Sequence, residues 1–546
     1  MNGRIAKAAL TALTIGGLSA IGLAASGGTA AAASKTIYVS PVAKSTAKGT
    51  SCPTAKYSFI QQAVAAAPKG GTVIICDGTY TMANQNVKPF TPMVVIDKSL
   101  TFLGQSATID GSGGTPGTGA LIDIAITASH VTVSGFTLTG AVDEGVVALP
   151  DAALKSPGEF PAKPSSPLTH ITITGNLVNG VDRGFVSPNG CVLAFEYFGD
   201  CGGGIHFNAV AYSTISHNTV TDNAEGILIT DDAGPADHNT ISNNQTINNP
   251  IECGIVLPSH NSRAASVKFN PNGTYTITRL NPKKAGVYDN LVENNISLNN
   301  GTAGFRGNTA GSGSGYLIAA AGPGTASYNN VIKNNIAHGN GLAGVVIHGH
   351  YVGGVYVGGN KITGNTLGLN NTGGDQLDSP WTPMDTASTG ILIESAGRIT
   401  MTVSGNHISD DGIGIWHNKA VTLKGSNTFS NTGTKVYAPS VPFGSAWCAP
   451  VNFFPQVCPP AKNGTATLYG FAVPNGSKTT SYFRYGTKKN DLTKKTAVQN
   501  DGKGVKIVGQ TANLKNLKSK TTYYFELVVK NAQGTTTGSE LSFTTT

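Results

Sequence analysis

The sequence predicts an all-β protein, made of a right-handed parallel β-helix solenoid followed by a small β-sandwich. Length is the first observation, because 546 residues exceed what one compact core holds and favour a repeat or several domains. Composition is the second: 70 glycines, 39% hydrophobic and only 12% charged residues fit short strands joined by tight turns better than helices or disorder. The third is a short phrase that recurs along the chain.

The repeated phrase consists of an Asn turn, a few alternating apolar residues, a second Asn or Asp turn, and Gly-Ile or a close variant. Segments 218–227 and 335–345 are clear examples. Indexing on the glycine gives Gly204, Gly226, Gly254, Gly304, Gly344, Gly368, Gly390 and Gly412. The short intervals fit one coil of a solenoid, and the two long intervals predict inserted loops at 260–286 and 307–327. A leucine-rich repeat has a similar period, but the turns here use Asn and the strands use Ile and Val.

The two ends of the solenoid have predicted covers, which protect open strand edges from pairing with other chains. At the start, Ser58 to Gln61 reads as a capping box for an apolar helix from Ile60 to Ala67. At the far end, the Pro-rich and aromatic segment 437–460 predicts a cap and linker.

Segment 57–80 resembles the start of right-handed β-helix proteins of the pectate-lyase-like superfamily, through Ile60-Gln61, Gly71-Thr72-Val73 and Gly78-Thr79-Tyr80. With the repeats, the resemblance covers residues 35 to about 440. It implies a polysaccharide-directed protein without naming a reaction. Of the polygalacturonase motifs, only Asp231-Asp232 is a partial match, and His348-Gly349-His350 inverts the Gly-His-Gly motif. The Arg-x-Pro-x-x-Arg segment of pectate lyases is absent from the sequence.

The last segment, 462–546, resembles a fibronectin type III-like sandwich. Tyr523, Phe525, Leu527 and Val529 alternate toward one face, and further strands are expected near 466–472 and 481–485. Twelve lysines and one arginine stand against four acidic residues here, a net charge of +9. Two interpretations remain open: a surface for an anionic polymer, or simply a soluble secreted module.

An apolar stretch after Arg4 and Lys7 predicts a signal peptide over residues 1–33. The domain prediction is then a solenoid over 34–440, a disulfide-containing linker over 441–461 and a sandwich over 462–546. We expect a secreted or cell-surface monomer without a membrane span. The cysteine spacing predicts three local disulfides and leaves Cys253 as a buried thiol. The predicted pairs are Cys52–Cys76, Cys191–Cys201 and Cys448–Cys458.

If Gly-Ile starts the same strand in every coil, the second and fourth residues after the Gly point outward and stack into columns. The second-place column is His206, Leu228, Val256, Arg306, Val346 and Leu392. The fourth-place column is Asn208, Thr230, Pro258, Asn308, His348, Glu394 and Trp416. Such columns would concentrate ionisable side chains along an open groove.

The predicted catalytic residues are Asp231, Asp232, Arg306, His350 and Glu394. The predicted substrate-binding residues are His206, His260, His348 and Trp416, whose ring would stack on a sugar. Paired carboxylates can share acid and base roles in glycoside hydrolysis; alternatively, Asp231 and Asp232 would hold Ca²⁺ while a base removes a proton beside a uronate carboxylate. The bland alternative is a turn before Gly234-Pro235.

These observations lead to two functional hypotheses. One is a secreted polysaccharide lyase or glycoside hydrolase that acts in the β-helix groove. The other is a non-catalytic adhesion protein that binds glycan. Both take an extracellular polysaccharide as partner, and no basic-aromatic motif in the sequence suggests nucleic acid.

Overall fold

The computed structural model describes residues 35–115, 118–155, 165–182, 202–270, 274–303, 313–350, 353–372, 388–448, 458–462 and 464–546. Residues 35–546 form one compact unit. The predicted signal peptide, Arg306, Asn308 and the predicted pair Cys191–Cys201 lie outside the described residues.

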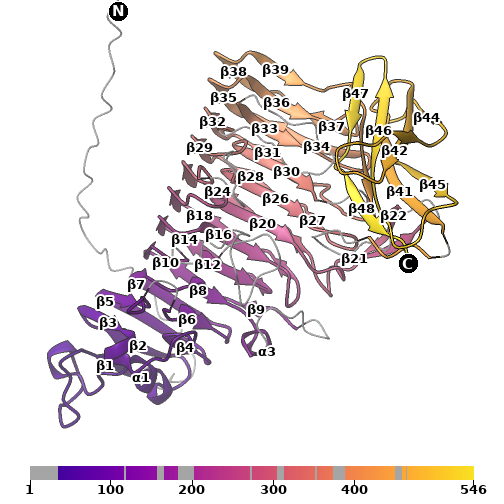
Figure 1. Ribbon diagram of the computed structural model, residues 1–546. Coiled ribbons are helices and arrows are strands. Elements are labelled where there is room, and N and C mark those ends of the chain that lie inside the picture. Colours follow the sequence, from indigo (N-terminus) through magenta and orange to yellow (C-terminus); the bar gives the residue numbers. More distant parts are fainter. Residues whose placement is uncertain are drawn as a thin grey trace, which may run out of the picture. The chain divides into compact units, whose positions relative to one another are not determined.

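The body of this unit is a right-handed parallel β-helix, in which successive coils stack their strands into three parallel sheets (Figure 1). The largest, sheet A, contains β1 Thr36–Val39, β2 Gly71–Ile75, β3 Gly78–Thr81, β5 Leu100–Asp110, β7 Val131–Thr139, β10 Thr172–Thr174, β11 Leu177–Asn179, β14 Thr214–Ser216, β15 Thr219–Thr221, β18 Thr240–Ser242, β19 Gln245–Ile247, β24 Leu291–Glu293, β25 Ile296–Leu298, β28 Val331–Lys333, β29 Ile336–His338, β31 Lys361–Thr363, β32 Thr366–Gly368, β34 Ile399–Ser404, β35 His407–Ser409, β37 Val421–Lys424 and β38 Thr428–Ser430.

Sheet B carries the candidate site and runs as one ordered stack. Its strands are β4 Val94–Ile96, β6 Ile122–Ile126, β8 Glu144–Ala148, β12 Gly203–Asn208, β16 Glu225–Thr230, β20 Ile255–Ser259, β26 Tyr316–Ala320, β30 Val345–Gly349, β33 Thr389–Ile393, β36 Ile413–His417 and β39 Thr434–Tyr437. The small sheet C contains β9 Leu168–Thr169, β13 Val210–Ala211, β17 Ala236–Asp237, β23 Val287–Tyr288 and β27 Ser327–Tyr328.

Buried asparagines hold the turns of neighbouring coils together. In one ladder, Asn295 receives both the backbone N–H and the side-chain N–H of Asn244 on its Oδ1, at 2.9 and 3.0 Å, and passes the same pattern to Asn335. The left-handed residue is the one before the ladder residue, such as Asn294 with φ 57° or Asn334 with φ 54°. The buried amide therefore satisfies backbone groups that the bend removes from the sheet.

The interior of the stack is a continuous apolar column of inward β-branched side chains. Ile205, Ile227 and Ile255 face one another on successive strands of sheet B and are fully buried. Because every coil contributes such residues at the same positions, each coil buries its apolar side only against its neighbours.

The N-terminal cover is the helix α1 Ile60–Ala66, one residue shorter than predicted. The predicted capping box is wrong, because the N-cap residue is Phe59, which has no side-chain oxygen to accept a backbone N–H. Gln61 instead pairs with the backbone of Val95, and Gln85 accepts the N–H of Ile60 at 2.8 Å. These long-range contacts fasten the helix to the second coil. The remaining short helices are η1 Cys52–Thr54, α2 Met82–Gln85 and α3 Asp151–Leu154.

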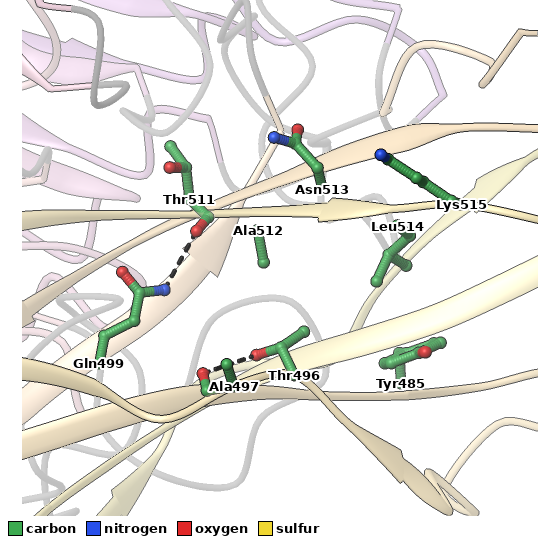
Figure 2. Close-up of a pocket in the computed structure, with 9 residues that line it drawn as sticks. All are labelled: Tyr485, Thr496, Ala497, Gln499, Thr511, Ala512, Asn513, Leu514 and Lys515. Atoms are coloured by element: carbon green, nitrogen blue, oxygen red, sulfur yellow. Dashed lines mark hydrogen bonds between the residues drawn. The ribbon is translucent and has the colours of Figure 1, made fainter.

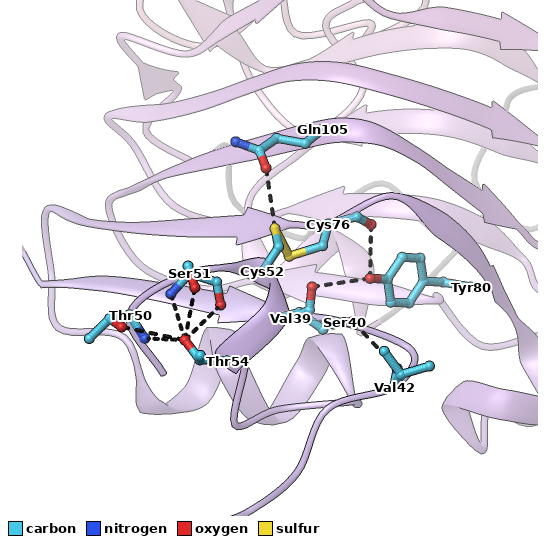
Figure 3. The surroundings of a disulfide bond; sticks show 10 residues. All are labelled: Val39, Ser40, Val42, Thr50, Ser51, Cys52, Thr54, Cys76, Tyr80 and Gln105. Carbon is cyan, nitrogen blue, oxygen red and sulfur yellow. Dashed lines mark hydrogen bonds between the residues drawn. A yellow bond between two sulfur atoms is a disulfide. The ribbon is translucent and has the colours of Figure 1, made fainter. Parts of the chain in front are cut away.

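A predicted disulfide, Cys52–Cys76, ties the cover to the first coils (Figure 3). Beside it, the buried Tyr80 hydroxyl donates to the carbonyls of Val39 and Cys76 at 3.2 and 3.0 Å. The predicted Cys448–Cys458 disulfide is also present, and Cys253 is a buried free thiol as expected.

The chain ends in two packed antiparallel sheets. One contains β40 Phe443–Trp447, β41 Ala466–Val473 and β45 Val508–Leu514; the other contains β42 Thr479–Gly486, β43 Lys494–Lys495, β44 Gln499–Gly502, β46 Thr522–Asn531, β47 Gly534–Thr537 and β48 Leu541–Thr544. Tyr523, Phe525, Leu527 and Val529 point into the core between them, as the alternation predicted. Strand β40 lies inside the segment expected to be a linker and pairs with β41, so the sheet begins before residue 462.

Three indexing predictions, Gly304, Gly368 and Gly412, differ from the observed register. The coil after Gly254 enters sheet B at Gly315-Tyr316, where Ile255 pairs with Tyr316, and not at Gly304. Gly368 lies in sheet A, and Gly390 aligns with Gly414, since Ile391 pairs with Ile415. Segment 260–286 does hold an inserted element, the hairpin of β21 Ala265–Phe269 and β22 Tyr275–Leu280. The second insertion was placed too late, because β26 and β27 belong to the regular coils.

Candidate functional site

The outer face of sheet B does not form one long open groove. The register aligns His206, Leu228, Val256, Leu317, Val346, Leu392 and Trp416 in a single outward column, with Leu317 in the place predicted for Arg306. From Val346 onward this column packs against Phe443, Trp447, Phe471 and Val473 of the sandwich. An apolar stripe on a strand face has to be covered, and the C-terminal sandwich covers it.

Trp416 belongs to this interface. Its side chain is only 2% exposed and its ring centre lies 6.4 Å from that of Phe443. The ring is therefore engaged inside the protein, which corrects its predicted role as a platform for a sugar. It also stands in the second-place column beside Leu392, and not in the fourth-place column.

Asp231 is fully buried and all of its carboxylate capacity is used within the fold. Oδ1 accepts the backbone N–H groups of His260 and Asn261 at 2.8 and 3.2 Å, and Oδ2 accepts the Ser259 hydroxyl and the Gly286 N–H at 2.8 and 2.7 Å. Burial raises the pKa of Asp231 to about 6; Asp232 adds to the rise, and His260 and the backbone donors oppose it. Asp231 therefore holds together the two chain segments that flank the inserted hairpin.

Asp232 and His260 form a carboxylate–imidazole pair just below the surface. His260 Nδ1 lies 3.0 Å from Asp232 Oδ1, and the two side chains are 6% and 13% exposed, respectively. Burial alone would raise the pKa of Asp232, but the His260 ring and hydrogen bonds from His260 and Thr230 lower it below its usual value. An ionised Asp232 only accepts, so His260 Nδ1 carries a proton and donates it to Asp232 Oδ1.

Behind this pair, a chain of hydrogen bonds runs inward. Thr230 Oγ1 donates to Asp232 Oδ2 at 2.7 Å, so it accepts from His206 Nε2 at 2.8 Å. His206 Nδ1 lies 2.7 Å from Glu144 Oε1, and both of these side chains are fully buried. Asn208 adds a further donor to Asp232 at 3.1 Å. The chain links three successive strands and holds the Asp232 carboxylate in one orientation.

Further carboxyls lie beside the inner end of this chain. Asp143 and Asp182 are buried, and neither Asp143 oxygen has a hydrogen-bond partner among the residues that the structure describes. Burial raises the pKa of Asp182 to about 8, and burial together with Glu144 and Asp182 raises that of Asp143 far above its usual value. Burial therefore favours the protonated forms of these two carboxyls. No cluster of three metal-ligating side chains occurs in the described ranges.

Calcium does not fit the predicted pair of carboxylates. Every Asp231 oxygen already accepts two donors, and Asp232 accepts from His260, Thr230 and Asn208. A hard cation needs several free oxygen ligands, whereas Asp231 supplies none and Asp232 keeps a single lone-pair site on Oδ1.

His348, His350 and Glu394 lie farther along the same face. His348 Nε2 and His350 Nε2 are 3.1 Å apart and share a hydrogen bond, and burial lowers the pKa of His348 to about 4. Glu394 is buried and follows β33, four strands after β16, which corresponds to about 19 Å at a strand spacing of about 4.8 Å. Asp232 and Glu394 are thus too far apart for the roughly 5–10 Å separation of a glycosidase pair.

The site therefore brings together four of the predicted residues, Asp231, Asp232, His206 and His260, and leaves His348, His350 and Glu394 as a second group. The sequence reasoning missed Glu144. Its signal was present, because Asp143-Glu144-Gly145-Val146 has the same turn-Gly-Val form as the phrase at Glu225-Gly226-Ile227. Extending the alignment of Gly-Ile phrases by one coil toward the N-terminus, to Gly145-Val146, places Glu144 on the strand next to that of His206.

Comparison with known proteins supports the architecture. The family model "Right handed beta helix region" matches residues 124–277. Among solved structures, similarity is found to the pectate lyase Pel9A, with TM-score 0.39 and 16% identity over 74% of this chain and 79% of that one. The A-module of the mannuronan C-5 epimerase AlgE6 from Azotobacter vinelandii is similar with a TM-score of 0.33 and 16% identity, over 70% of this chain and 94% of that one. An exopolygalacturonase from Thermotoga maritima is similar with a TM-score of 0.36 and 12% identity, over 66% of this chain and 84% of that one.

With such low TM-scores and identities, these similarities transfer neither an activity nor a residue role to this chain. A comparison with curated proteins finds no significant match. Within the described part of the chain, no helix is long and apolar enough to cross a bilayer.

Proposed function

We propose that this chain is a secreted carbohydrate-active protein that removes a proton from an acidic polysaccharide at the Asp232–His260 pair, as a polysaccharide lyase. The observation that carries the proposal is the hydrogen-bonded chain from Glu144 through His206 and Thr230 to Asp232. It fixes the carboxylate that orients His260, and a histidine oriented in this way is a general base near neutral pH. The predicted signal peptide supports secretion, and the resemblance of segment 57–80 and the repeats to the pectate-lyase-like superfamily supports a polysaccharide substrate.

Elimination is favoured over hydrolysis by the state of the carboxyls. A glycosidase needs two carboxyls within about 10 Å, whereas Asp231 is committed to four donors and Glu394 lies four strands away. Proton removal beside a uronate carboxylate needs one base and a positive group for the substrate carboxylate. Arg263, three residues after His260 and half-buried, is the candidate for the second role.

In this mechanism His260 Nε2 takes the proton next to the carboxylate, and Asp232 stabilises the imidazolium that forms. The electron pair left behind forms a double bond to the neighbouring carbon, whose bond to the glycosidic oxygen breaks, and the departing oxygen takes up a proton from water. The products are a new chain end and a sugar with a carbon–carbon double bond.

The test measures ultraviolet absorbance of unsaturated uronates and release of reducing ends over a panel of acidic and neutral polysaccharides. We expect absorbance to rise with an acidic polymer and to fall by about a hundredfold or more in His260→Gln. His407→Gln is the matched control, since His407 is exposed on sheet A and its ring hydrogen-bonds to the Thr428 and Ser430 hydroxyls, away from the Asp232–His260 pair. Reducing ends without absorbance, or full activity in His260→Gln, would overturn the proposal.

A second candidate function is non-catalytic glycan binding. The observation in its favour is that the sandwich covers the C-terminal half of the sheet B face and that His260 is nearly buried. It predicts retention of glycan without turnover in the same assays.

A further inference from the structure

The outer face of sheet A carries a column of threonines along the first coils of the solenoid (Figure 1). The strand registers align Thr36, Thr72, Thr101, Thr132, Thr172, Thr214 and Thr240 on successive coils. Their chain neighbours Ile173 and Ile215 are fully buried in the core, so by alternation the threonines point outward. All seven threonines are half-buried, and none of their hydroxyls forms a hydrogen bond with a residue that the structure describes.

A column of exposed rings stands beside the last four threonines. His130, His170, Tyr212 and His238 each lie two residues before a threonine, at a corner of the coil where φ is between 50° and 60°. The rings of His130 and His170 are stacked with their centres 4.6 Å apart, and those of Tyr212 and His238 with their centres 4.7 Å apart. Since the ring faces meet one another, the ring edges and their polar atoms are what a ligand would contact.

The two columns end at the same coil. In the coil after Thr240, Leu291 takes the place of the threonine and Asp289 takes the place of the ring. A change of residue type at the same step in both columns indicates that they belong to one surface. That surface extends from Thr132 to Thr240, over four coils and about 14 Å at a strand spacing of about 4.8 Å.

A third column adds hydroxyls on the other side of the threonines. It contains Ser134, Thr174, Ser216 and Ser242, each two residues after a threonine. Ser242 is only 9% exposed, and its hydroxyl has no hydrogen-bond partner among the residues that the structure describes. Buried hydroxyls are normally paired, so an unused one beside the threonines favours a ligand above it.

We call these three columns, over the four coils from Thr132 to Thr240, the hydroxyl strip. It contains no Lys, Arg, Asp or Glu. Asp237, which precedes His238, is buried and hydrogen-bonds to the Nδ1 of that ring at 2.6 Å. A charged polymer would therefore lose hydration here without meeting an opposite charge, whereas an uncharged one loses nothing of this kind.

The repeat of the strip restricts the shape of its ligand. Each coil presents the same hydroxyls one strand spacing further along, and each hydroxyl both donates and accepts. A linear chain with hydroxyls on every short unit matches this repeat, and an extended polysaccharide is such a chain. The rings project beside the small hydroxyls, so the strip suits one narrow chain better than a flat surface.

Strand preference alone explains an exposed threonine elsewhere in the protein, but not the hydroxyl strip. In the sandwich, Thr511 of β45 is exposed, and Gln499 Nε2 donates to its carbonyl at 3.0 Å (Figure 2). The residue paired with it across the sheet is Tyr469, and the next outward residue of the strand is Asn513. Thr511 is therefore not part of a threonine column.

We propose that the hydroxyl strip binds an extended, uncharged polysaccharide chain that runs along the solenoid axis. This inference goes beyond the proposed lyase activity, because the strip lies on sheet A and His260 follows a strand of sheet B. The protein would then be held on a neutral polymer while His260 acts on an acidic one.

Isothermal titration of the full-length protein with linear β-1,4-linked hexasaccharides of glucose, mannose and xylose tests the proposal. We expect at least one of them to bind, and Thr172→Val to weaken that binding by about two- to tenfold, since it removes one hydrogen bond. Valine keeps the branched side chain that strands prefer. Thr402→Val is the matched control, because Thr402 continues the same column beyond the strip, between Lys361 and Lys424.

A second variant tests the ring column. Tyr212→Asn removes a ring that is 56% exposed, and asparagine tolerates the positive φ of this corner. It should also weaken binding of the neutral hexasaccharide, by about twofold or more.

Failure of all three neutral hexasaccharides to bind would overturn the proposal. Equal losses in Thr172→Val and Thr402→Val, or tighter binding of an oligogalacturonate of the same length, would do so too. His260→Gln should retain full affinity for the neutral hexasaccharide. Loss of affinity in that variant would place the chain at the Asp232–His260 pair instead, so the test separates this proposal from the proposed lyase activity.

Discussion

Asp411 occupies a position that asparagine holds elsewhere in the solenoid. In the ladder Asn249, Asn300, Asn340 and Asn370, each Oδ1 accepts from the previous coil, and each amide group donates to a carbonyl on the preceding strand. Asp411 continues the acceptor half, because its Oδ1 takes the Asn370 N–H at 3.0 Å. Its Oδ2 is buried without a partner. Substitution Asp411→Asn should therefore stabilise the protein.

The magnitude follows from the pKa of this carboxyl. Burial raises it from 3.8 to about 7, with Asp410 adding to the rise and the Asn370 N–H opposing it. The folded protein thus binds the proton more tightly than the unfolded chain, and its stability falls as pH rises from about 4 to about 7. At 1.36 kcal/mol per pKa unit, the full effect above pH 7 is about 4 kcal/mol, and we expect Asp411→Asn to recover about 2–4 kcal/mol.

Urea unfolding midpoints of wild type and Asp411→Asn at acidic, neutral and mildly alkaline pH provide the measurement. The advantage of the variant should be small near pH 4 and largest above pH 7. Asp410→Asn is the matched control, because Asp410 is exposed and its pKa is lowered by a hydrogen bond from Asn431. An Asp411→Asn advantage that is absent at pH 8, or that does not vary with pH, would refute the reasoning.

Three further predictions concern the packing of the solenoid. Because burial lowers the pKa of His348 to about 4, the free energy of unfolding should fall as pH drops from about 6.5 to 4. In urea unfolding, His348→Gln should lose up to about 3 kcal/mol less of this free energy than the wild type. Equal acid sensitivity of the two proteins would contradict the prediction. Trp416→Ala should lower the free energy of unfolding by about 3–5 kcal/mol and speed proteolytic release of the sandwich. Tyr437→Ala is the control and should do neither, because Tyr437 follows Trp416 in the same column but is 41% exposed. Reduction of the Cys52–Cys76 disulfide should lower the free energy of unfolding by about 3 kcal/mol. If a reductant lowered the unfolding midpoint of a Cys52→Ser/Cys76→Ser variant by the same amount, the loss would not come from this disulfide.

The candidate site shows where prediction from sequence stops. Asp231 and Asp232 are adjacent and chemically identical in the sequence, yet Asp231 accepts four donors from the inserted hairpin region and Asp232 orients a histidine. The difference arises from residues 28 to 55 positions away, which a local pattern does not contain. In the outward column, the place between Val256 and Val346 was predicted for Arg306 but is taken by Leu317. The sequence does not show whether the inserted loop precedes or follows the indexed glycine, so it does not fix where the strand begins.

The sequence by itself determined the solenoid, its asparagine turns, the helix at its start and the alternating strand in the sandwich, because each depends on a short period that repeats along the chain. Only the tertiary structure decided the register across the insertions and which residues the sandwich covers. Trp416 illustrates the reason: its outward direction follows from alternation, but whether an outward side chain meets solvent or another apolar face depends on contacts between residues distant in sequence. Those contacts cover the C-terminal half of the expected open groove and leave the Asp232–His260 pair just below the surface outside the covered part.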